Sequence, residues 1–301
     1  MPSTHSFLKN RDIKKTGGYI LDVVSVLKDG NIEDMVERAV NLVLAGGLEE
    51  IIDKGDRVLI KPNLAAPKQS NTGATTNPRV VLKLIGLVKS AGGIPIVGES
   101  PIVGYNTEEV FYRTKYKLLM KGQGIDIIDF NADTPVEVSI KGALALKEVK
   151  LAKSALDCDK FISVPVMKTH DACTVTLSLK NLKGCMYQNE KYSSHRVGVH
   201  KAIADLNTLI KPDFAIIDAI VGMEGMGPTA GDPVRMNMII AGKELASVDT
   251  VASNIMGFNA TKIKHIQYAS QKGFGTTDLQ QIEVLGEPIQ KVFRKFQAAT
   301  W

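Results

Sequence analysis

The sequence predicts an α/β protein in which mainly parallel sheets are flanked by helices, with a site at the carboxyl ends of the strands. Strand-like and helix-like segments alternate along the 301 residues, which is the pattern of a helix-covered parallel sheet. The length allows one large unit or two lobes, and we favour two α/β lobes, residues 18–150 and 151–289, with a peripheral tail at 290–301. Several predicted strands also share a polar ending.

The first half alternates regularly between strands and helices. Ile32–Leu44 is an amphipathic helix with acidic residues in its opening turns, and Pro78 begins a helix that ends at Gly92. A third helical stretch covers Tyr105–Gly122. The predicted strands are Leu21–Leu27, Arg57–Ile60, Ile94–Val97 and Ile125–Phe130, followed by an antiparallel pair at Val136–Ser139 and Leu146–Val149.

The second half continues the alternation. Its predicted strands are Lys160–Met167, Phe214–Ile217, Met236–Ala241 and Ile282–Val284. Its predicted helices are Ala172–Leu182, His200–Ile210, Leu245–Met256 and a peripheral helix from Gln290. Pro165 cannot donate a ladder hydrogen bond, which predicts an edge position or a bulge. A glycine-rich loop is expected over Gly222–Asp232.

Composition narrows the classes of partner. The net charge is +5, but the lysines are spread along the chain with few aromatic residues among them, so no nucleic-acid groove is indicated. No apolar run approaches the roughly 18 residues of a membrane span, and the polar start resembles no signal peptide, which predicts a cytoplasmic protein without membrane partners. The basic balance favours a small anionic ligand.

Three cysteines, Cys158, Cys173 and Cys185, form no CxxC pair. The sequence therefore contains no disulfide framework and no self-contained iron–sulfur or zinc motif. Reduced structural thiols are the simpler interpretation. Cys185 lies beside the expected site, and its redox role stays open.

Four predicted strands end in polar side chains. Ile60 precedes Lys61-Pro62-Asn63, Val97 precedes Gly98-Glu99, Met167 precedes Lys168-Thr169-His170, and Ile217 precedes Asp218. Any one of these endings is commonly a solvated loop. In a parallel sheet, however, the carboxyl ends meet at one edge, so we expect the four endings to converge on one crevice.

The residue types at these endings indicate anion chemistry. Lys168 and His170 are the candidate catalytic residues, as a base, a covalent attachment point or a metal ligand, and His200 is a second histidine candidate. Lysine and amide donors suit phosphate or carboxylate groups. The candidate ligand-binding residues are Lys61, Asn63, Thr169, Lys180, Asn181, Lys183, Gly225 and Gly227.

Carboxylates offer a candidate site for a divalent metal. Glu99, Glu224 and Asp232 supply the oxygen ligands that magnesium prefers, although the same side chains could instead pair with the lysines. The dinucleotide fingerprint GxGxxG, the phosphate loop GxxxxGK[ST], and the HExxH and GxSxG motifs are all absent, which disfavours those enzyme classes.

These residues also carry a family resemblance. The chain resembles the family labelled domain of unknown function 362 through segments between Lys61 and Glu287, including Lys61-Pro62-Asn63-Leu64, Glu99-Ser100-Pro101, Pro165–His170, Ser178–Gly184, Ile217–Thr229 and Ala246–Asp249. Many members carry an appended ferredoxin-type CxxCxxCxxxCP module, and this chain lacks it. The resemblance therefore implies the core domain without the iron–sulfur module.

Two functions stay open at this point. The first is an enzyme or carrier that holds a small anionic metabolite or cofactor, with or without a divalent metal, in the Lys/His/Asn site. The second, implied by the resemblance, is a non-catalytic binding or maturation module that works with a separate ferredoxin-type partner. A remoter similarity to the lactate racemase fold implies a cofactor held by lysine and histidine, but no histidine-rich motif of that enzyme is present.

Overall fold

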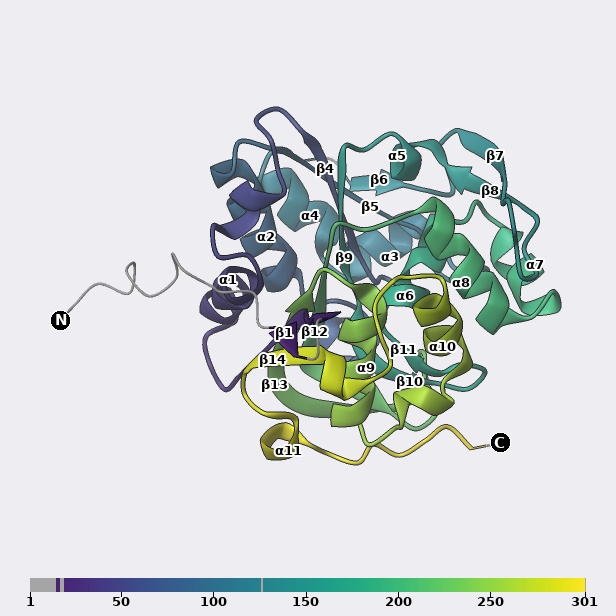
Figure 1. Cartoon of the computed structure of the whole chain (residues 1–301). Coiled ribbons are helices and arrows are strands. Elements are labelled where there is room, and N and C mark those ends of the chain that lie inside the picture. Colours follow the sequence, from purple (N-terminus) through teal and green to yellow (C-terminus); the bar gives the residue numbers. More distant parts are fainter. Residues whose placement is uncertain (1–14, 17–18, 126, 301) are drawn as a thin grey trace.

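One large sheet runs through the protein in the computed structural model, which describes residues 15–16, 19–125 and 127–300. The sheet has ten strands, and its main row follows the order β14–β3–β13–β12–β9–β4–β5–β6 (Figure 1). In that order the strands are Ile282–Gly286, Asp22–Lys28, Asp232–Gly242, Phe214–Glu224, Lys160–Val164, Arg57–Pro62, Ile94–Glu99 and Ile127–Asp129. The polar start, residues 1–14, and Asp126 of a predicted strand lie outside the described residues.

The sheet is mainly parallel, which confirms the predicted fold class. Within the main row, β13 is antiparallel to both of its neighbours, β12 and β3, and the other neighbouring strands are parallel. Strand β10 (Val166–His170) runs parallel to β12, and β11 (Thr174–Thr176) pairs antiparallel with β10. The carboxyl ends of β4, β5, β10 and β12 therefore point the same way.

Strands from both halves of the chain share this sheet. Strand β4 pairs with β9, and β3 pairs with both β13 and β14. The boundary that we placed near residue 150 thus runs between strands of a single sheet, and the division into two lobes stays a prediction.

Alternate side chains of the strands supply two cores, one on each face of the sheet. In β4, Val58 and Ile60 belong to one core and Leu59 to the other. The first core is covered by α1 (Ile32–Val43), α2 (Pro78–Ser90), α3 (Thr107–Arg113) and α4 (Tyr116–Gly122). The second is covered by α6 (Ser178–Asn181), α8 (Val199–Leu209), α9 (Leu245–Ile255) and α10 (Lys264–Gln271) (Figure 1). Helices of the first and second halves therefore cover opposite faces.

Local sequence signals explain where the first helices begin. Oδ1 of Asn31 accepts the N–H of Glu33 at 2.9 Å, and Oδ1 of Asn77 accepts the N–H of Arg79 at 3.0 Å. Each bond satisfies an N–H that has no partner inside the helix. Pro78 occupies the first turn of α2, where its missing N–H costs nothing.

The remaining strands and α-helices are short. They are β1 (Lys15–Thr16), β2 (Tyr19–Ile20), the antiparallel pair β7 (Pro135–Ser139) and β8 (Glu148–Ala152), and the helices α5 (Lys153–Leu156), α7 (Glu190–Arg196) and α11 (Ile289–Val292). The antiparallel pair agrees with the sequence. Among the described residues, no helix is both long and apolar enough to cross a bilayer.

Several predicted boundaries are wrong. The strand expected over Lys160–Met167 is two strands separated by Pro165, and the pairing of β10 with β12 has a register shift after Val166. The segment Ala172–Leu182, predicted as a helix, begins as β11. It forms a strand because β10 offers it a ladder, and tertiary pairing overrides a weak helical pattern.

Other differences concern lengths. Strands β12 and β13 extend to Glu224 and Asp232, so the glycine-rich loop between them is shorter than expected. Lys115, at φ 66°, separates α3 from α4 inside the predicted Tyr105–Gly122 helix. The tail has only the four-residue helix α11. Beyond it, the N–H groups of Arg294 and Phe296 bond to the end of α9.

Candidate functional site

A cavity of about 300 Å³ opens at the carboxyl ends of the strands, where the sequence predicted a site. Asn63 follows β4, Glu99 ends β5, and Lys168 and His170 belong to β10. The rest of the wall comes from the segments that follow β4, β5 and β10, from those around α6 and α7, and from the loop before β13. The wall side chains that bear nitrogen or carboxylate groups are Asn63, Glu99, Lys168, His170, Asp171, Lys180, Asn181, Lys183, Lys191 and His195.

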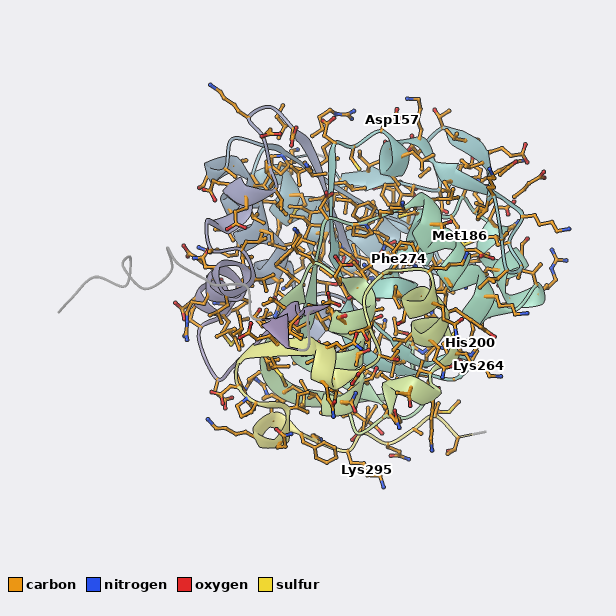
Figure 2. The ribbon with its side chains drawn as sticks, in the orientation of Figure 1. Asp157, Met186, His200, Lys264, Phe274 and Lys295 are labelled. Carbon is orange, nitrogen blue, oxygen red and sulfur yellow. The ribbon has the colours of Figure 1, made fainter. Side chains whose placement is uncertain are left out.

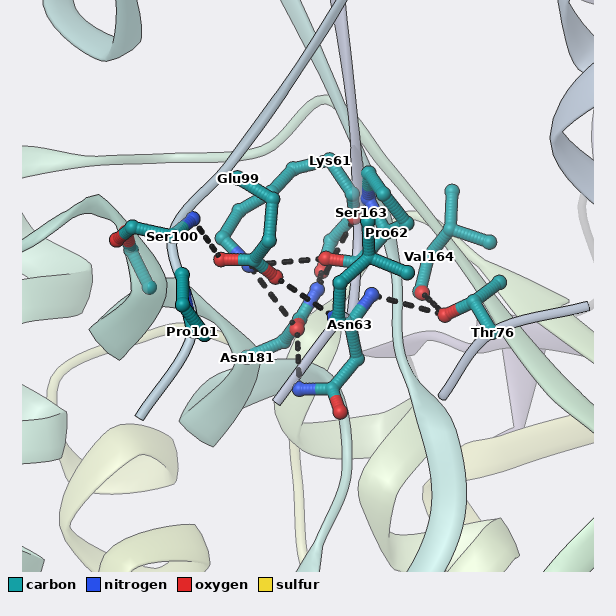
Figure 3. Close-up of polar contacts among 12 residues, drawn as sticks. Lys61, Pro62, Asn63, Thr76, Glu99, Ser100, Pro101, Ser163, Val164 and Asn181 are labelled. Atoms are coloured by element: carbon teal, nitrogen blue, oxygen red, sulfur yellow. Dashed lines mark hydrogen bonds and ion pairs between the residues drawn. The ribbon is translucent and has the colours of Figure 1, made fainter. Parts of the chain in front are cut away.

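A buried ion pair supports the floor of the cavity. Nζ of Lys61 lies 2.6 Å from Oε2 of Glu99, and both side chains are almost completely buried (Figure 3). The N–H of Ser100 donates to Oε1 of the same carboxylate at 2.7 Å. Gly184 packs directly against this pair, because a Cβ at that position would overlap Oε1 of Glu99. The ammonium group of Lys61 therefore already balances the negative charge of Glu99.

Two asparagines connect this ion pair to the wall. Oδ1 of Asn181 accepts from Nζ of Lys61 and from Nδ2 of Asn63, both at 3.2 Å (Figure 3). Nδ2 of Asn181 donates to Oγ of Ser163 at 3.1 Å. Asn181 stands here because Asp249 of α9 accepts the N–H groups of Ser178 and Leu179 at 2.8 and 3.0 Å and so fixes the start of α6.

Lys168 is buried and held by two oxygens. Its Nζ donates to Oδ1 of Asn63 and to the carbonyl of Ala74, both at 2.7 Å. Burial, followed by the charge of Lys180, lowers the pKa of Lys168 well below its usual value. Among the described residues, no carboxylate lies within ion-pair distance of it.

His170 points into the same cavity, two residues along β10. Its Nδ1 lies 2.7 Å from Oδ1 of Asp171, which also accepts the N–H of Ala172 at 2.6 Å. Nδ1 also lies 3.0 Å from the backbone nitrogen of Ala172, whose N–H can donate to it when the ring proton is on Nε2, whereas a hydrogen bond to Asp171 requires the proton on Nδ1. Burial lowers the pKa of His170, and Lys180 lowers it further, so the ring is neutral near pH 7.

Helix α7 adds a second group of nitrogens to the wall. Nζ of Lys183 lies 2.8 Å from Nε2 of His195. Nζ of Lys191 donates to Oγ of Ser100 at 2.5 Å and to the carbonyl of Pro101 at 2.8 Å. Burial lowers the pKa of Lys183 to about 7, of Lys191 to about 8 and of His195 to about 4.

Lys180 has no hydrogen-bond or ion-pair partner for its ammonium among the described residues, and burial lowers its pKa too.

The family model described as "Domain of unknown function (DUF362)" matches residues 58–254, which is more than half of the chain. The chain belongs to this family. A thylakoid-associated protein of Synechocystis sp. is 29% identical to this family member over 253 residues, which cover 82% of this chain and 77% of that protein.

Two solved structures have backbone traces similar to that of this chain. The lactate racemase apoprotein of Thermoanaerobacterium thermosaccharolyticum has a TM-score of 0.48 and 12% identity, covering 83% of this DUF362 chain and 56% of that one. A protein from Thermotoga maritima has a TM-score of 0.37 and 11% identity, covering 80% and 58%. This family member thus spans less than two thirds of the length of either structure.

Many residues selected from the sequence meet at the cavity of this family member. Asn63, Lys168, His170, Lys180, Asn181 and Lys183 line it, as does Glu99. Lys61 lies beneath the wall and contacts Glu99 instead of the open space. Asp218, the fourth strand ending, is buried away from the wall and accepts the N–H of Asn77. His200 lies outside the cavity, stacked on His265 with ring centroids 5.5 Å apart and near Lys264 (Figure 2).

Thr169, Gly225 and Gly227 were expected to bind the ligand, but they do not line the cavity. Thr169 points to the other side of β10, where its Oγ1 donates to the carbonyl of Gly225 at 2.9 Å. Gly227 packs so closely on the Thr169 backbone that a Cβ would overlap the carbonyl oxygen. These contacts position the loop, and it is Pro228 and Thr229 that line the cavity.

The three carboxylates proposed as metal ligands are not brought together. Glu224 and Asp232 face each other across β12 and β13 and do not line the cavity, and Glu224 pairs with Arg294 at 3.4 Å. Glu99 is paired with Lys61. In the described part of the chain, no group of three or more His, Cys, Asp or Glu side chains is placed to hold a metal.

The cysteines are free thiols, and Cys173 and Cys185 are buried. Burial raises the pKa of Cys185 to about 12 and that of Cys158 to about 11. A thiol that stays protonated at neutral pH is a weak nucleophile and a poor metal ligand.

Sequence reasoning missed the contribution of α7. Lys191 and His195 both reach the cavity because residues four apart lie on one face of a helix. That spacing was visible in the sequence, but no helix was expected over Glu190–Arg196. Asp171 and Ser100 were also missed, since each is a single polar residue beside a selected one.

Proposed function

We propose that this DUF362 protein binds a small anionic metabolite or cofactor, through a phosphate or carboxylate group, in the cavity at the carboxyl ends of its strands. The observation that carries the proposal is an excess of cations. Lys168, Lys180, Lys183 and Lys191 line the cavity, whereas its carboxylates are Glu99 and Asp171. Glu99 is already paired with Lys61, so an anion that enters the cavity meets lysines without a carboxylate partner and favours their charged forms.

The depressed lysine pKa values support the same function. Each ammonium is disfavoured by burial and by its cationic neighbours. An anion bound among them would stabilise the charged forms and take up protons, because opposite charges favour ionisation. Binding would therefore be tighter below pH 7 than above pH 8.

The test is a thermal unfolding series with inorganic phosphate, pyrophosphate and citrate against sodium chloride at matched ionic strength. A bound anion raises Tm, because it stabilises the folded state by RT ln(1 + L/Kd), where L is the free anion concentration. Lys180→Met removes the unpartnered ammonium, and the loss of one charged hydrogen bond weakens binding about tenfold or more. Lys121→Met, an exposed lysine of α4, is the matched control and leaves the shift intact.

An absent shift for all three anions would contradict the proposal. It would favour the alternative function, a non-catalytic module that works with a separate ferredoxin-type partner. Mass spectrometry of small molecules released from the freshly purified protein gives an independent answer, since a stoichiometric phosphorylated or carboxylated compound supports the binding site directly.

A further inference from the structure

Lys183 differs from the other cavity lysines in its hydrogen bonding. Nζ of Lys168 donates to two oxygens and Nζ of Lys191 to three, the third being Oδ1 of Asn131 at 3.4 Å. Such oxygen partners stabilise a charged ammonium. Nζ of Lys183 has instead a nitrogen partner, Nε2 of His195 at 2.8 Å. Within the described residues, no carboxylate lies within ion-pair distance of Lys183.

This environment favours the neutral amine. Burial and the charges of Lys180 and Lys191 lower the pKa of Lys183 to about 7, and the pKa of His195 falls to about 4. An amine N–H can therefore donate to the neutral His195 ring and leave the amine lone pair unused. A desolvated lysine beside other cations is the form of this side chain that attacks carbonyl groups.

Lys180 supplies a second amino group on the same face of the cavity wall as Lys183. Lys180 and Lys183 are three residues apart across α6 and the 3-10 turn Leu182–Cys185, a spacing that places both on one face. Both line the cavity, and the ammonium of Lys180 lacks a protein partner among the described residues. A compound with a carboxylate next to a carbonyl group would match this pair.

We propose that Lys183 forms a Schiff base with the carbonyl carbon of a small oxo acid whose carboxylate binds Lys180. This inference rests on the proposed anion site and adds its substrate class. The amine lone pair attacks the carbonyl carbon, and His195 carries one proton from the nitrogen to the resulting oxyanion, which gives the neutral carbinolamine. His195 then carries the second nitrogen proton to the hydroxyl group, the C–O bond breaks, and water leaves as the C=N bond forms. The step consumes no oxidant or reductant.

The experiment is reductive trapping on the full chain. The protein is incubated with pyruvate or glyoxylate and sodium cyanoborohydride, followed by intact-mass and peptide-mass spectrometry. The expected result is a single adduct with the mass of the acid less one oxygen atom, located on the peptide that contains Lys183. With the acid held at a saturating concentration, the yield rises between pH 6 and pH 8, as the amine loses its proton.

Variants separate this chemistry from general lysine labelling. Lys183→Arg keeps the charge but removes the nucleophile, so the adduct falls to the level without reductant. His195→Gln slows adduct formation at Lys183, because the side chain that carries the protons is lost. Lys121→Arg, on the surface, behaves like the parent protein.

The outcomes distinguish the two proposals. A phosphate-dependent Tm shift with no adduct from either acid would overturn the Schiff base and leave the anion site standing. Adducts spread over many lysines, or an unchanged adduct in Lys183→Arg, would also overturn it. Absence of both the shift and the adduct would remove the anion site together with its substrate.

Discussion

At the scale of single residues, the site depends on a few side chains that are buried although they are charged. Lys61 and Glu99 form an ion pair with almost no solvent contact, and each would be unstable there without the other. Gly184 lets the backbone approach this pair, which explains why a residue without a side chain stands between Lys183 and Cys185. The cavity wall thus depends on this buried ion pair.

Removing one partner of the buried pair should be costly. Lys61→Met leaves Glu99 buried without its counter-charge, and we expect a loss of about 3–5 kcal/mol in the free energy of unfolding. Lys83 pairs with Glu37 on the surface at 2.6 Å, so Lys83→Met should cost about 1 kcal/mol or less. Urea unfolding of both variants measures the difference. Equal effects would mean that the Lys61–Glu99 pair is not buried in solution.

Adding one methyl group at Gly184 should disturb the same pair. In Gly184→Ala the Cβ meets Oε1 of Glu99 and the end of Lys61, and we expect a loss of about 1–3 kcal/mol. Gly122, at the end of α4, has open space for a Cβ, so Gly122→Ala serves as control and should be neutral or slightly stabilising. Chemical denaturation compares the two. A neutral Gly184→Ala would refute the close packing.

At the scale of elements, the wall is positioned by contacts between segments that are distant in sequence. Asp249 of α9 fixes the start of α6. Pro165 separates β9 from β10, in which Lys168 pairs with β12 and His170 pairs with β11. The C-terminal tail holds the loop that carries Pro228 and Thr229 through two hydrogen bonds. The N–H of Gly225 donates to the carbonyl of Gln297, and the N–H of Gln297 donates to Oε2 of Glu224 at 3.0 Å.

Asp249 should make stability depend on pH. Burial raises the pKa of this carboxyl from 3.8 to about 7, so between these pH values the folded protein holds a proton that the unfolded chain releases. Stability is therefore highest below pH 4 with respect to this group and is lost as pH rises toward 7, by at most about 1.4 kcal/mol per pH unit.

The asparagine variant isolates that contribution. Asp249→Asn cannot titrate, so its stability relative to the parent protein should rise between pH 5 and pH 8. Other raised groups, such as Asp218 with a pKa of about 6, are common to both proteins and cancel in the difference. Urea unfolding across this range gives the slope, and a difference that does not change with pH would show that Asp249 keeps an ordinary pKa.

The tail offers two phenylalanines with opposite exposure. Phe296 is 2% exposed against α9, whereas Phe293 is 53% exposed. Phe296→Ala should cost about 3 kcal/mol and release the tail to proteases, while Phe293→Ala should change stability by about 0.5 kcal/mol or less. Limited proteolysis and thermal unfolding would report both effects. Equal behaviour of the two variants would mean that the tail is not docked.

At the scale of the whole molecule, one sheet joins the two halves of the chain while their helices cover opposite faces. Strand β4 of the first half pairs with β9 of the second, and β3 pairs with β13 and β14. We therefore expect a single unfolding transition, with coincident loss of far-UV circular dichroism and of the near-UV signal of the tyrosines. A fragment of residues 18–150 should not fold alone. Two separate transitions, or a folded fragment, would support the two-lobe division.

The sequence alone determined the α/β class, the mainly parallel sheet and the edge at which polar side chains gather. These follow from local patterns: the alternation of apolar segments, Pro78 at a helix start, and strands that end at Lys61, Glu99 and Lys168. Residues such as Asn181 and Lys183 were found because they lie close in sequence to a strand ending.

The tertiary structure alone decided what each polar residue contacts. It turned Thr169 away from the cavity while admitting Lys168 and His170, it placed Lys61 below the wall, and it separated Glu99 from Glu224 and Asp232. It also brought in His195 and Lys191 from α7. Pairing between distant strands sets register and burial, and these determine which side chains meet and how their pKa values shift, which no local pattern encodes.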